Sequence, residues 1–302
     1  MEQLNCTNNT SNSSSTASSV SWNSSHLVPA VILSICFVLG VPGNLAVIIR
    51  KPNFHHMSSL SQSLMLNLAI SDLLCLLTLP FWIYPLLYNW TLGLVTCKVL
   101  AYVLYCSMYG SMLTITVLSV QRCLQVVYQQ KCLDQVGKKR ILVLLWLVVM
   151  TLYSPVFLVR ELTKDQRCKT SCRPKYSSQA QWMVVLLTES LMGFGSFSVV
   201  TFSYICLHRK VNQAAFFNNP QTTRLVASII VAFFVLWIPY HTINVMAALA
   251  FSLNNEGLLK LCKDSWNIVG ALTAVNSCLN PILYTFTSQN MRIMCSGQNS
   301  EN

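Results

Sequence analysis

Charge is the scarcest property of this sequence. Only 10% of its 302 residues are Asp, Glu, Lys or Arg, whereas 53% are hydrophobic. A typical soluble domain carries about 25% charged residues, so a soluble chain of this composition would expose a large apolar surface. The scarcity excludes an ordinary soluble domain. Because the apolar residues are gathered in long blocks, it favours a protein that lies within a membrane.

The first 26 residues also lack the basic start and the apolar run of a secretory signal peptide. They are rich in Ser, Asn and Thr, and they contain several N-glycosylation sequons, Asn-x-Ser/Thr. One sequon is weak evidence, but several in one short polar tail indicate a glycosylated segment outside the cytosol. The sequons begin at Asn5, Asn8, Asn9, Asn12 and Asn23, and another begins at Asn89.

Seven apolar stretches are long enough to cross a bilayer about 30 Å thick, which takes roughly 20 helical residues. They should be helices, because a closed strand barrel would show short alternating runs instead. The expected spans are 28–50, 60–86, 98–128, 141–160, 181–207, 224–250 and 264–287. The sequence therefore predicts an all-α, seven-transmembrane helix bundle over 28–287, after an extracellular tail over 1–27 and before a short amphipathic C-terminal helix and stub over 288–302.

Loop charges predict the orientation. The loops expected on one side are basic and contain almost no acid, so they should be cytoplasmic. The loop between the fourth and fifth spans is also basic, yet it must lie on the other side, together with the sequons. Its charge either attracts an anionic ligand or belongs to a solvated loop with no ligand role. The net charge of +11 is not gathered outside these loops, so nucleic acid is not an expected partner.

Asp72 is the clearest ionisable residue inside a span. Placing a charged side chain within a membrane costs free energy, so such a residue indicates a function. A carboxylate among neutral oxygens suits a small hard cation such as sodium. The alternative is a structural Asp satisfied by water. Polar neighbours for a metal site at Asp72 are expected from Asn44, Ser111, Asn276 and Asn280.

Short motifs occur in a fixed order along the spans. They are Gly43-Asn44, Leu68-Ala69 with Asp72, Arg122 at the end of the third span, Trp146, Trp237-Ile-Pro239-Tyr240 and Asn280-Pro281-Ile-Leu-Tyr284. Each is weak alone, but together they resemble the rhodopsin-like G-protein-coupled receptors over nearly the whole chain. The resemblance implies a receptor and not an enzyme, with a heterotrimeric G protein and arrestin as partners and no cofactor apart from an allosteric sodium ion.

The resemblance also implies roles for single residues. Trp237 would be a rotamer switch below the ligand. Arg122, Tyr204 and Tyr284 would form the cytoplasmic cluster that rearranges to admit the G protein; for the two tyrosines the alternative is an interfacial aromatic role.

A disulfide is implied as well. Cys97 would pair with the second outer loop, where Cys168 and Cys172 compete and the surroundings of Cys172 favour it. Cys6 would then pair with Cys262 or with Cys168, and the sequence does not decide between them.

Two departures from the family pattern matter. The family usually has an acid before the arginine, but this chain has Gln121. A neutral amide holds an arginine less strongly than a carboxylate does, so we expect a less clamped inactive state and higher basal activity. The fifth span also lacks its usual proline, which puts its local bulge in doubt.

Within the family, the third span reads Tyr102-Val-Leu-Tyr-Cys-Ser-Met-Tyr-Gly-Ser111, the sixth reads Trp237-Ile-Pro-Tyr-His-Thr-Ile-Asn244, and the outer loop reads Cys172-Arg-Pro-Lys-Tyr176. These stretches look like the chemoattractant branch and most like the leukotriene B4 receptors. Arg160 would hold a carboxylate. The residues that would bond hydroxyls are Glu189, Tyr240, His241 and Asn244. Those that would line the apolar part of the pocket are Tyr105, Met108, Tyr109 and Trp237. Ala101 stands where those receptors carry a His.

Each pocket residue also has a plain structural reading. Arg160 can extend to the membrane interface, and Glu189 can pair with a neighbouring span. His241, Met108 and Tyr109 can be core residues. The sequence leaves these readings open.

The expected function is thus a plasma-membrane receptor for an anionic lipid, with its N-terminus outside. The short basic third inner loop suggests a G protein of the inhibitory class by analogy. A peptide chemoattractant receptor, formyl-peptide-like or chemokine-like, is the alternative, together with a constitutively active orphan receptor. A tail whose only acid is Glu2, without tyrosine through Leu27, argues against a basic protein ligand. A transporter is disfavoured, because no inverted repeat is visible.

Overall fold

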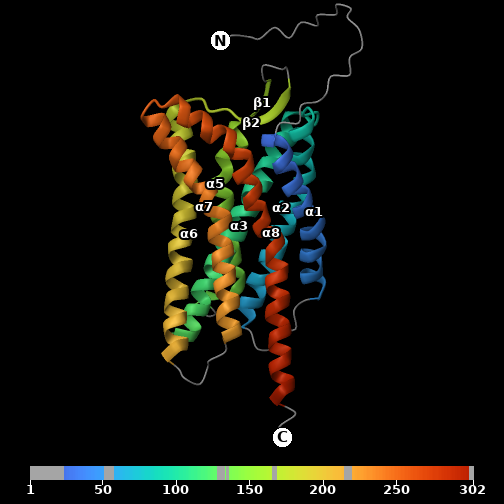
Figure 1. Cartoon of the computed structure of the whole chain (residues 1–302), viewed down its shortest axis with the longest axis vertical. Coiled ribbons are helices and arrows are strands. Elements are labelled where there is room, and N and C mark those ends of the chain that lie inside the picture. Colours follow the sequence, from blue (N-terminus) through green and yellow to red (C-terminus); the bar gives the residue numbers. More distant parts are fainter. Residues whose placement is uncertain are drawn as a thin grey trace, which may run out of the picture.

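The computed structural model describes residues 24–50, 58–127, 133, 136–164, 169–213 and 220–298. Within them, seven long helices and one two-stranded hairpin follow one another along the chain (Figure 1). The elements are α1 (Ser24–Arg50), α2 (Ser59–Leu87), α3 (Gly93–Val127), α5 (Lys138–Val159), β1 (Arg160–Lys164), β2 (Thr170–Pro174), α6 (Gln179–Gln213), α7 (Pro220–Ser252) and α8 (Glu256–Gln298).

These helices form where the sequence is apolar for at least 20 residues, because in a bilayer every backbone group must be bonded within its own segment. Six of the described helices are long and apolar enough to cross a membrane. α8 lies outside that set, and it buries the polar side chains of Asn276, Ser277 and Asn280 against its neighbours. A helix that buries polar groups against its neighbours can still span a membrane, so the seven-helix bundle is confirmed.

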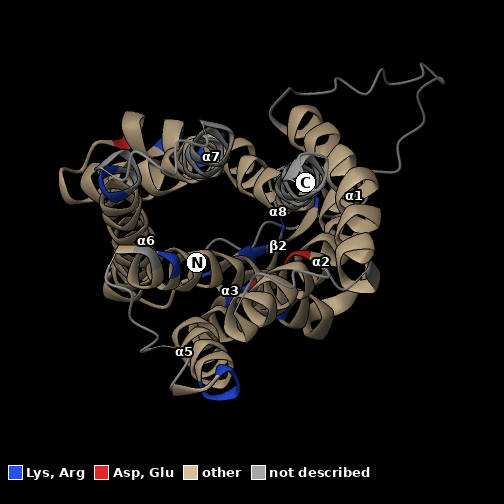
Figure 2. Cartoon of the chain, turned by 90° about the horizontal axis from the view of Figure 1, so that it is seen from below, with Lys and Arg blue, Asp and Glu red and all other residues tan. Residues whose placement is uncertain are grey.

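Six of the described helices form a closed ring in the order α1, α2, α3, α6, α7 and α8, and α5 packs on the outside of α3 (Figure 2). α1 packs against α2 and α8, α7 packs against α6 and α8, and α3 packs against α2, α5 and α6. Figure 2 shows the bundle end-on, with few charged residues along most of the ribbon. The largest buried cluster joins α2, α3, α5, α6 and α7 around Tyr109, Phe233 and Trp237.

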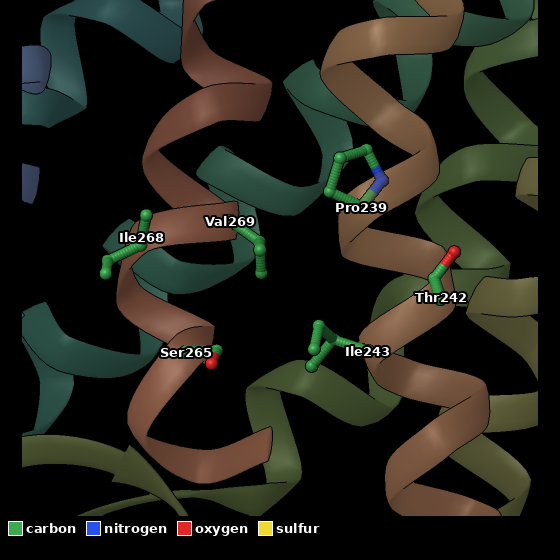
Figure 3. Close-up of a pocket in the computed structure, with 6 residues that line it drawn as sticks. All are labelled: Pro239, Thr242, Ile243, Ser265, Ile268 and Val269. Atoms are coloured by element: carbon green, nitrogen blue, oxygen red, sulfur yellow. The ribbon is translucent and has the colours of Figure 1, made fainter. Parts of the chain in front are cut away.

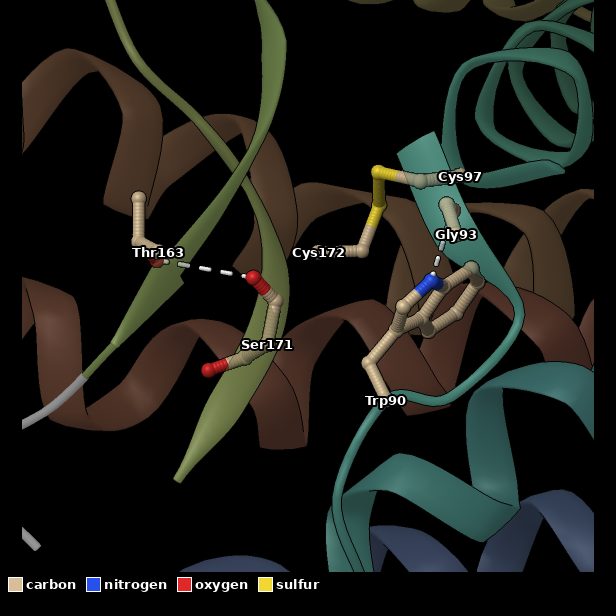
Figure 4. Close-up of a disulfide and its surroundings, with 6 residues drawn as sticks. All are labelled: Trp90, Gly93, Cys97, Thr163, Ser171 and Cys172. Carbon is tan, nitrogen blue, oxygen red and sulfur yellow. Dashed lines mark hydrogen bonds between the residues drawn. A yellow bond between two sulfur atoms is a disulfide. The ribbon is translucent and has the colours of Figure 1, made fainter. Parts of the chain in front are cut away.

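One end of the bundle, named here the hairpin end, carries β1 and β2 (Figure 1). The strands pair antiparallel, with Arg160 opposite Pro174. A disulfide joins Cys97 at the start of α3 to Cys172 in β2, with Cα atoms 5.7 Å apart (Figure 4). Beside it, Trp90 donates a 2.9 Å hydrogen bond to the carbonyl of Gly93. The hairpin is therefore attached to α3 and lies over the bundle.

The disulfide is formed by Cys172, the outer-loop cysteine that its sequence surroundings favoured. The suggested bond between Cys6 and Cys262 is not formed, since Cys262 carries a free thiol. Its side chain is fully buried beside Leu186, Ala247 and Ala248. Cys6 and Cys168 lie outside the described residues.

The helix boundaries differ most from expectation at the C-terminus. The separate amphipathic helix expected over 288–302 is instead a continuation of α8, which runs unbroken from Glu256 to Gln298. Between Pro281 and Gly297 the sequence has neither proline nor glycine, so no residue in that stretch favours a helix end. At the other terminus, α1 begins at Ser24 and not at 28.

Candidate functional site

Arg160 stands where α5 ends and β1 begins, at the hairpin end. Its guanidinium lies 5.8 Å from the ring centre of Trp82 and 5.7 Å from that of Tyr105. Both distances fall in the range of cation–π attraction. The backbone around it is pinned, because Lys175 donates a 2.7 Å bond to the carbonyl of Val159. The cation is thus held over two aromatic rings, one from α2 and one from α3.

Tyr176, in the loop after β2, belongs to the same neighbourhood. Burial raises the pKa of Tyr176 above its ordinary value, and the nearby Tyr105 and Glu189 raise it further, whereas Arg160 lowers it. The loop that follows the hairpin therefore lies against the predicted ligand residues.

Glu189 of α6 is the polar centre of the group. It is 3% exposed, and its Oε2 accepts a 2.8 Å hydrogen bond from the hydroxyl of Tyr240 and another of 2.8 Å from Nδ2 of Asn244. A buried carboxylate is costly unless it is hydrogen-bonded. The two donors on α7 stabilise it, which agrees with the structural reading of Glu189 as a pair with a neighbouring span.

Aromatic rings lie next to this polar centre. Tyr109 stacks on Tyr153 with ring centres 4.1 Å apart, and it meets the edge of Trp237 at 5.8 Å. His241 stacks on Trp237 at 5.8 Å with an angle of 12° between the rings. Met108 packs at the margin of the same cluster. The predicted apolar wall is thus continuous, and it is also the core of the bundle.

Several buried polar atoms of this group have no hydrogen-bond partner among the described residues. An unbonded buried polar group costs about 1–3 kcal/mol, and such groups call for an explanation. These atoms can bond a polar ligand that enters between the helices. They are Nε of Arg160, the hydroxyls of Tyr109 and Tyr153, Nε1 of Trp237, both ring nitrogens of His241, and Oδ1 of Asn244.

Asp72 is fully buried on α2. Ser111 donates a 2.8 Å bond to its Oδ1, and Asn280 donates a 2.7 Å bond to its Oδ2. Asn44 bonds backbone carbonyls of Gly40 and Ser277 instead, so it does not satisfy the carboxylate as expected.

Asn276 is buried without a bond to Asp72 in the described part of the chain. The described residues contain no group of three or more His, Cys, Asp or Glu side chains that could hold a metal ion. Asp72 is thus surrounded by neutral donors, and buried oxygens of Asn44 and Ser71 have no hydrogen-bond partner among the described residues.

The predicted switch residues lie at the end opposite the hairpin. Gln121, which is 1% exposed, donates a 2.7 Å bond from Nε2 to the hydroxyl of Ser58. Ser58 also caps α2 by accepting a 3.2 Å bond from the backbone of Ser61. The amide in place of the usual acid thus connects α3 to the start of α2. Arg122 and Tyr204 are partly buried near this end, and the side chain of Tyr284 lies outside the described part.

A groove of about 390 Å³ lies between α7 and α8. Figure 3 shows its lining of Pro239, Thr242, Ile243, Ser265, Ile268 and Val269. None of the nine predicted ligand residues lines it. The predicted ligand residues around Glu189 therefore lie apart from this groove.

Two members of the site were missed in the sequence. Trp82 lies in α2 beneath Arg160, and Tyr153 lies in α5 against Tyr109. The sequence held a weak indication of both, because each is an aromatic residue two positions from a proline inside a span. Trp82 follows Pro80, and Tyr153 precedes Pro155. Only the packing shows which neighbours they meet.

Comparison with known proteins agrees with this architecture. The model of the 7 transmembrane receptor (rhodopsin family) matches residues 43–284. The chain therefore belongs to the rhodopsin family of seven-transmembrane, G-protein-coupled receptors, which are integral membrane proteins and not enzymes.

The relatives are chemoattractant receptors. The chain is 33% identical to human leukotriene B4 receptor 1, over 85% of this chain and 76% of the relative. It is 31% identical to the C5a anaphylatoxin chemotactic receptor 1 of Danio rerio, over 86% of this chain and 77% of the relative. It is 29% identical to formyl peptide receptor-related sequence 4 of Mus musculus, over 92% and 89%. The chain is thus a chemoattractant-type receptor of this family.

Proposed function

We propose that this receptor binds an anionic lipid mediator of the leukotriene B4 type on the extracellular side of the plasma membrane and activates a heterotrimeric G protein of the inhibitory class. A lipid of this type has one carboxylate, hydroxyls and a long apolar tail. The site offers one cation, a buried polar centre and an aromatic wall, in that order from the hairpin end inward.

The observation that carries the proposal is the position of Arg160. A guanidinium binds a carboxylate through two parallel hydrogen bonds. Here it is held over Trp82 and Tyr105, and its Nε has no partner among the described residues. Tyr240, Asn244 and His241 then supply donors and acceptors for the hydroxyls further inside.

The orientation is part of the proposal. Asn89 is exposed in the loop between α2 and α3, at the hairpin end. If its sequon and those of the tail at 1–23 are glycosylated, both the hairpin and the N-terminus face outward. The opposite end, with Arg122, Tyr204 and Tyr284, would then receive the G protein and, after activation, arrestin.

Sodium at Asp72 is proposed as an allosteric ion. The buried carboxylate has only neutral partners in the described structure. A cation among these oxygens would compensate the negative charge.

A peptide ligand is the second candidate, and one surface feature favours it. The hairpin exposes Lys164, Arg173 and Lys175, and only Lys175 has an acidic partner, Glu161 at 2.9 Å, among the described residues. A peptide with acidic groups could contact this surface while its terminal carboxylate meets Arg160.

The deciding experiment is nucleotide exchange on an inhibitory-class G protein in membranes that contain the receptor, with and without leukotriene B4. Arg160→Ala should raise the half-maximal concentration at least tenfold, and Arg160→Lys should recover only part of the loss, because lysine cannot form the paired bonds. Lys164→Ala, an exposed change on the same hairpin, is the control and should respond like the wild type. No response of the wild-type receptor at normal surface level would refute the lipid assignment and direct attention to peptides.

A further inference from the structure

Gly193 on α6 lies directly against the imidazole of His241 on α7. A Cβ built at Gly193 would overlap three ring atoms of His241, namely Nε2, Cε1 and Cδ2. Real side chains do not approach so closely, so the absence of a side chain at this position is what admits the ring. Gly193 is buried, and His241 has no exposed surface at all.

The imidazole is enclosed on its other sides as well. Trp237 stacks against it at 5.8 Å, Phe197 meets it edge-on at 5.7 Å, and Tyr240 meets it edge-on at 5.5 Å. A densely packed interior cannot absorb an added methyl group without displacing a neighbour. Any side chain at residue 193 would therefore push His241 against Trp237 or push α6 away from α7.

A second link between the same helices lies one turn away. Glu189 is four residues before Gly193, so the two positions share one face of α6. Glu189 accepts the bonds of Tyr240 and Asn244 from α7. α6 and α7 are thus joined by hydrogen bonds at Glu189 and, one turn further along α6, by direct packing at Gly193.

We propose that Gly193 is a positioning residue for His241 and, through it, for Trp237, so that the Gly193–His241 contact stabilises the resting arrangement of α6 and α7. The proposal depends on G-protein coupling, which family membership supplies, and not on the identity of the ligand. Weakening the contact shifts the population away from the resting arrangement. Ligand-free signalling therefore rises when residue 193 gains a side chain.

The test is ligand-free nucleotide exchange per surface receptor. Gly193→Ala should raise it roughly fivefold, the effect of overpacking by one methyl group on a two-state equilibrium. Gly195→Ala is the matched control, because it lies on the same helix and a Cβ there would meet nothing within 4 Å. Both changes increase helix propensity equally, so only the contact with His241 distinguishes them.

A double substitution tests the mechanism. His241→Ala removes the ring that an added Cβ would overlap, so adding Gly193→Ala to His241→Ala should cause no further change. Equal behaviour of Gly193→Ala and Gly195→Ala would overturn the proposal, as would a Gly193→Ala effect of the same size in the His241→Ala background. If Gly193→Ala fails to reach the surface, the double variant must restore surface level, and its failure to do so would also overturn the proposal.

Discussion

The hydroxyl of Tyr240 donates a 2.8 Å hydrogen bond to Oε2 of Glu189 and so connects α7 to α6 across the bundle interior. Asn244, one turn further along α7, donates to the same oxygen at 2.8 Å. Both donors come from one face of one helix, so a single buried acceptor determines their distance from α6. The side chains that a ligand would contact here are therefore the same ones that join the two helices.

Removing the acceptor should destabilise the receptor. Glu189→Ala leaves the Tyr240 hydroxyl and the Asn244 amide without their partner, at a cost of about 1–3 kcal/mol. Glu189→Gln keeps a carbonyl acceptor and should cost less. Thermal unfolding in detergent measures both. The control is Glu161→Ala, whose pair with Lys175 is exposed and should change stability by at most about 1 kcal/mol. Equal melting temperatures for Glu189→Ala and Glu161→Ala would contradict the role of Glu189.

Sodium should reduce ligand-free nucleotide exchange if Asp72 holds the ion. Replacing sodium chloride with choline chloride at constant ionic strength should then raise exchange in the wild-type receptor. Asp72→Asn should abolish this difference, since a neutral amide binds a hard cation far less well than a carboxylate does. Asp264→Asn, an exposed change on α8, should retain it. Sodium sensitivity that persists in Asp72→Asn would exclude this site.

Gln121→Asp should lower basal activity. The carboxylate would accept a charge-assisted bond from the adjacent arginine, which is about twice as strong as a neutral one. A gain of about 1 kcal/mol would reduce ligand-free exchange roughly fivefold. Gln121→Asn separates charge from length, because it is as short as Asp but neutral, and it should give no such reduction. Unchanged ligand-free signalling in Gln121→Asp would show that the amide does not set the basal level.

Loss of the disulfide should lower the surface level of folded receptor. Cys97 and Cys172 are 75 residues apart in the sequence, and a link that closes a loop of this length typically contributes roughly 2–5 kcal/mol. Cys97→Ser, Cys172→Ser and the double variant should lose the same amount, because each removes the same bond. Cys262→Ser changes a free thiol near the same end of the bundle and serves as the comparison. Additive losses in the double variant would argue against a shared bond.

The spans were predictable because membrane burial leaves a strong one-dimensional signal. Each expected span overlaps one helix, and most observed helices extend a few residues beyond it at one or both ends. The largest error was at the C-terminus, where an amphipathic segment was expected to be a separate helix. Amphipathicity reports which faces are apolar, but it does not report whether the backbone breaks.

The site was predicted only in part. The resemblance supplied Arg160, Glu189 and Tyr240, and the structure places them near one another. It did not supply Trp82 or Tyr153, which lie on other helices and have no motif of their own. Gly193 has no side chain, so its importance follows only from the imidazole ring of His241 that lies against it.

The sequence by itself determined that this chain spans a membrane and which family it belongs to, because long apolar runs and ordered motifs are local properties of the chain. Only the tertiary structure decided that Glu189 is bonded by two donors from α7, that Asn44 bonds backbone carbonyls and not Asp72, and that His241 lies against Gly193. These relationships join residues from different helices. They depend on the rotation and spacing of the helices, which the packing of all their side chains sets together.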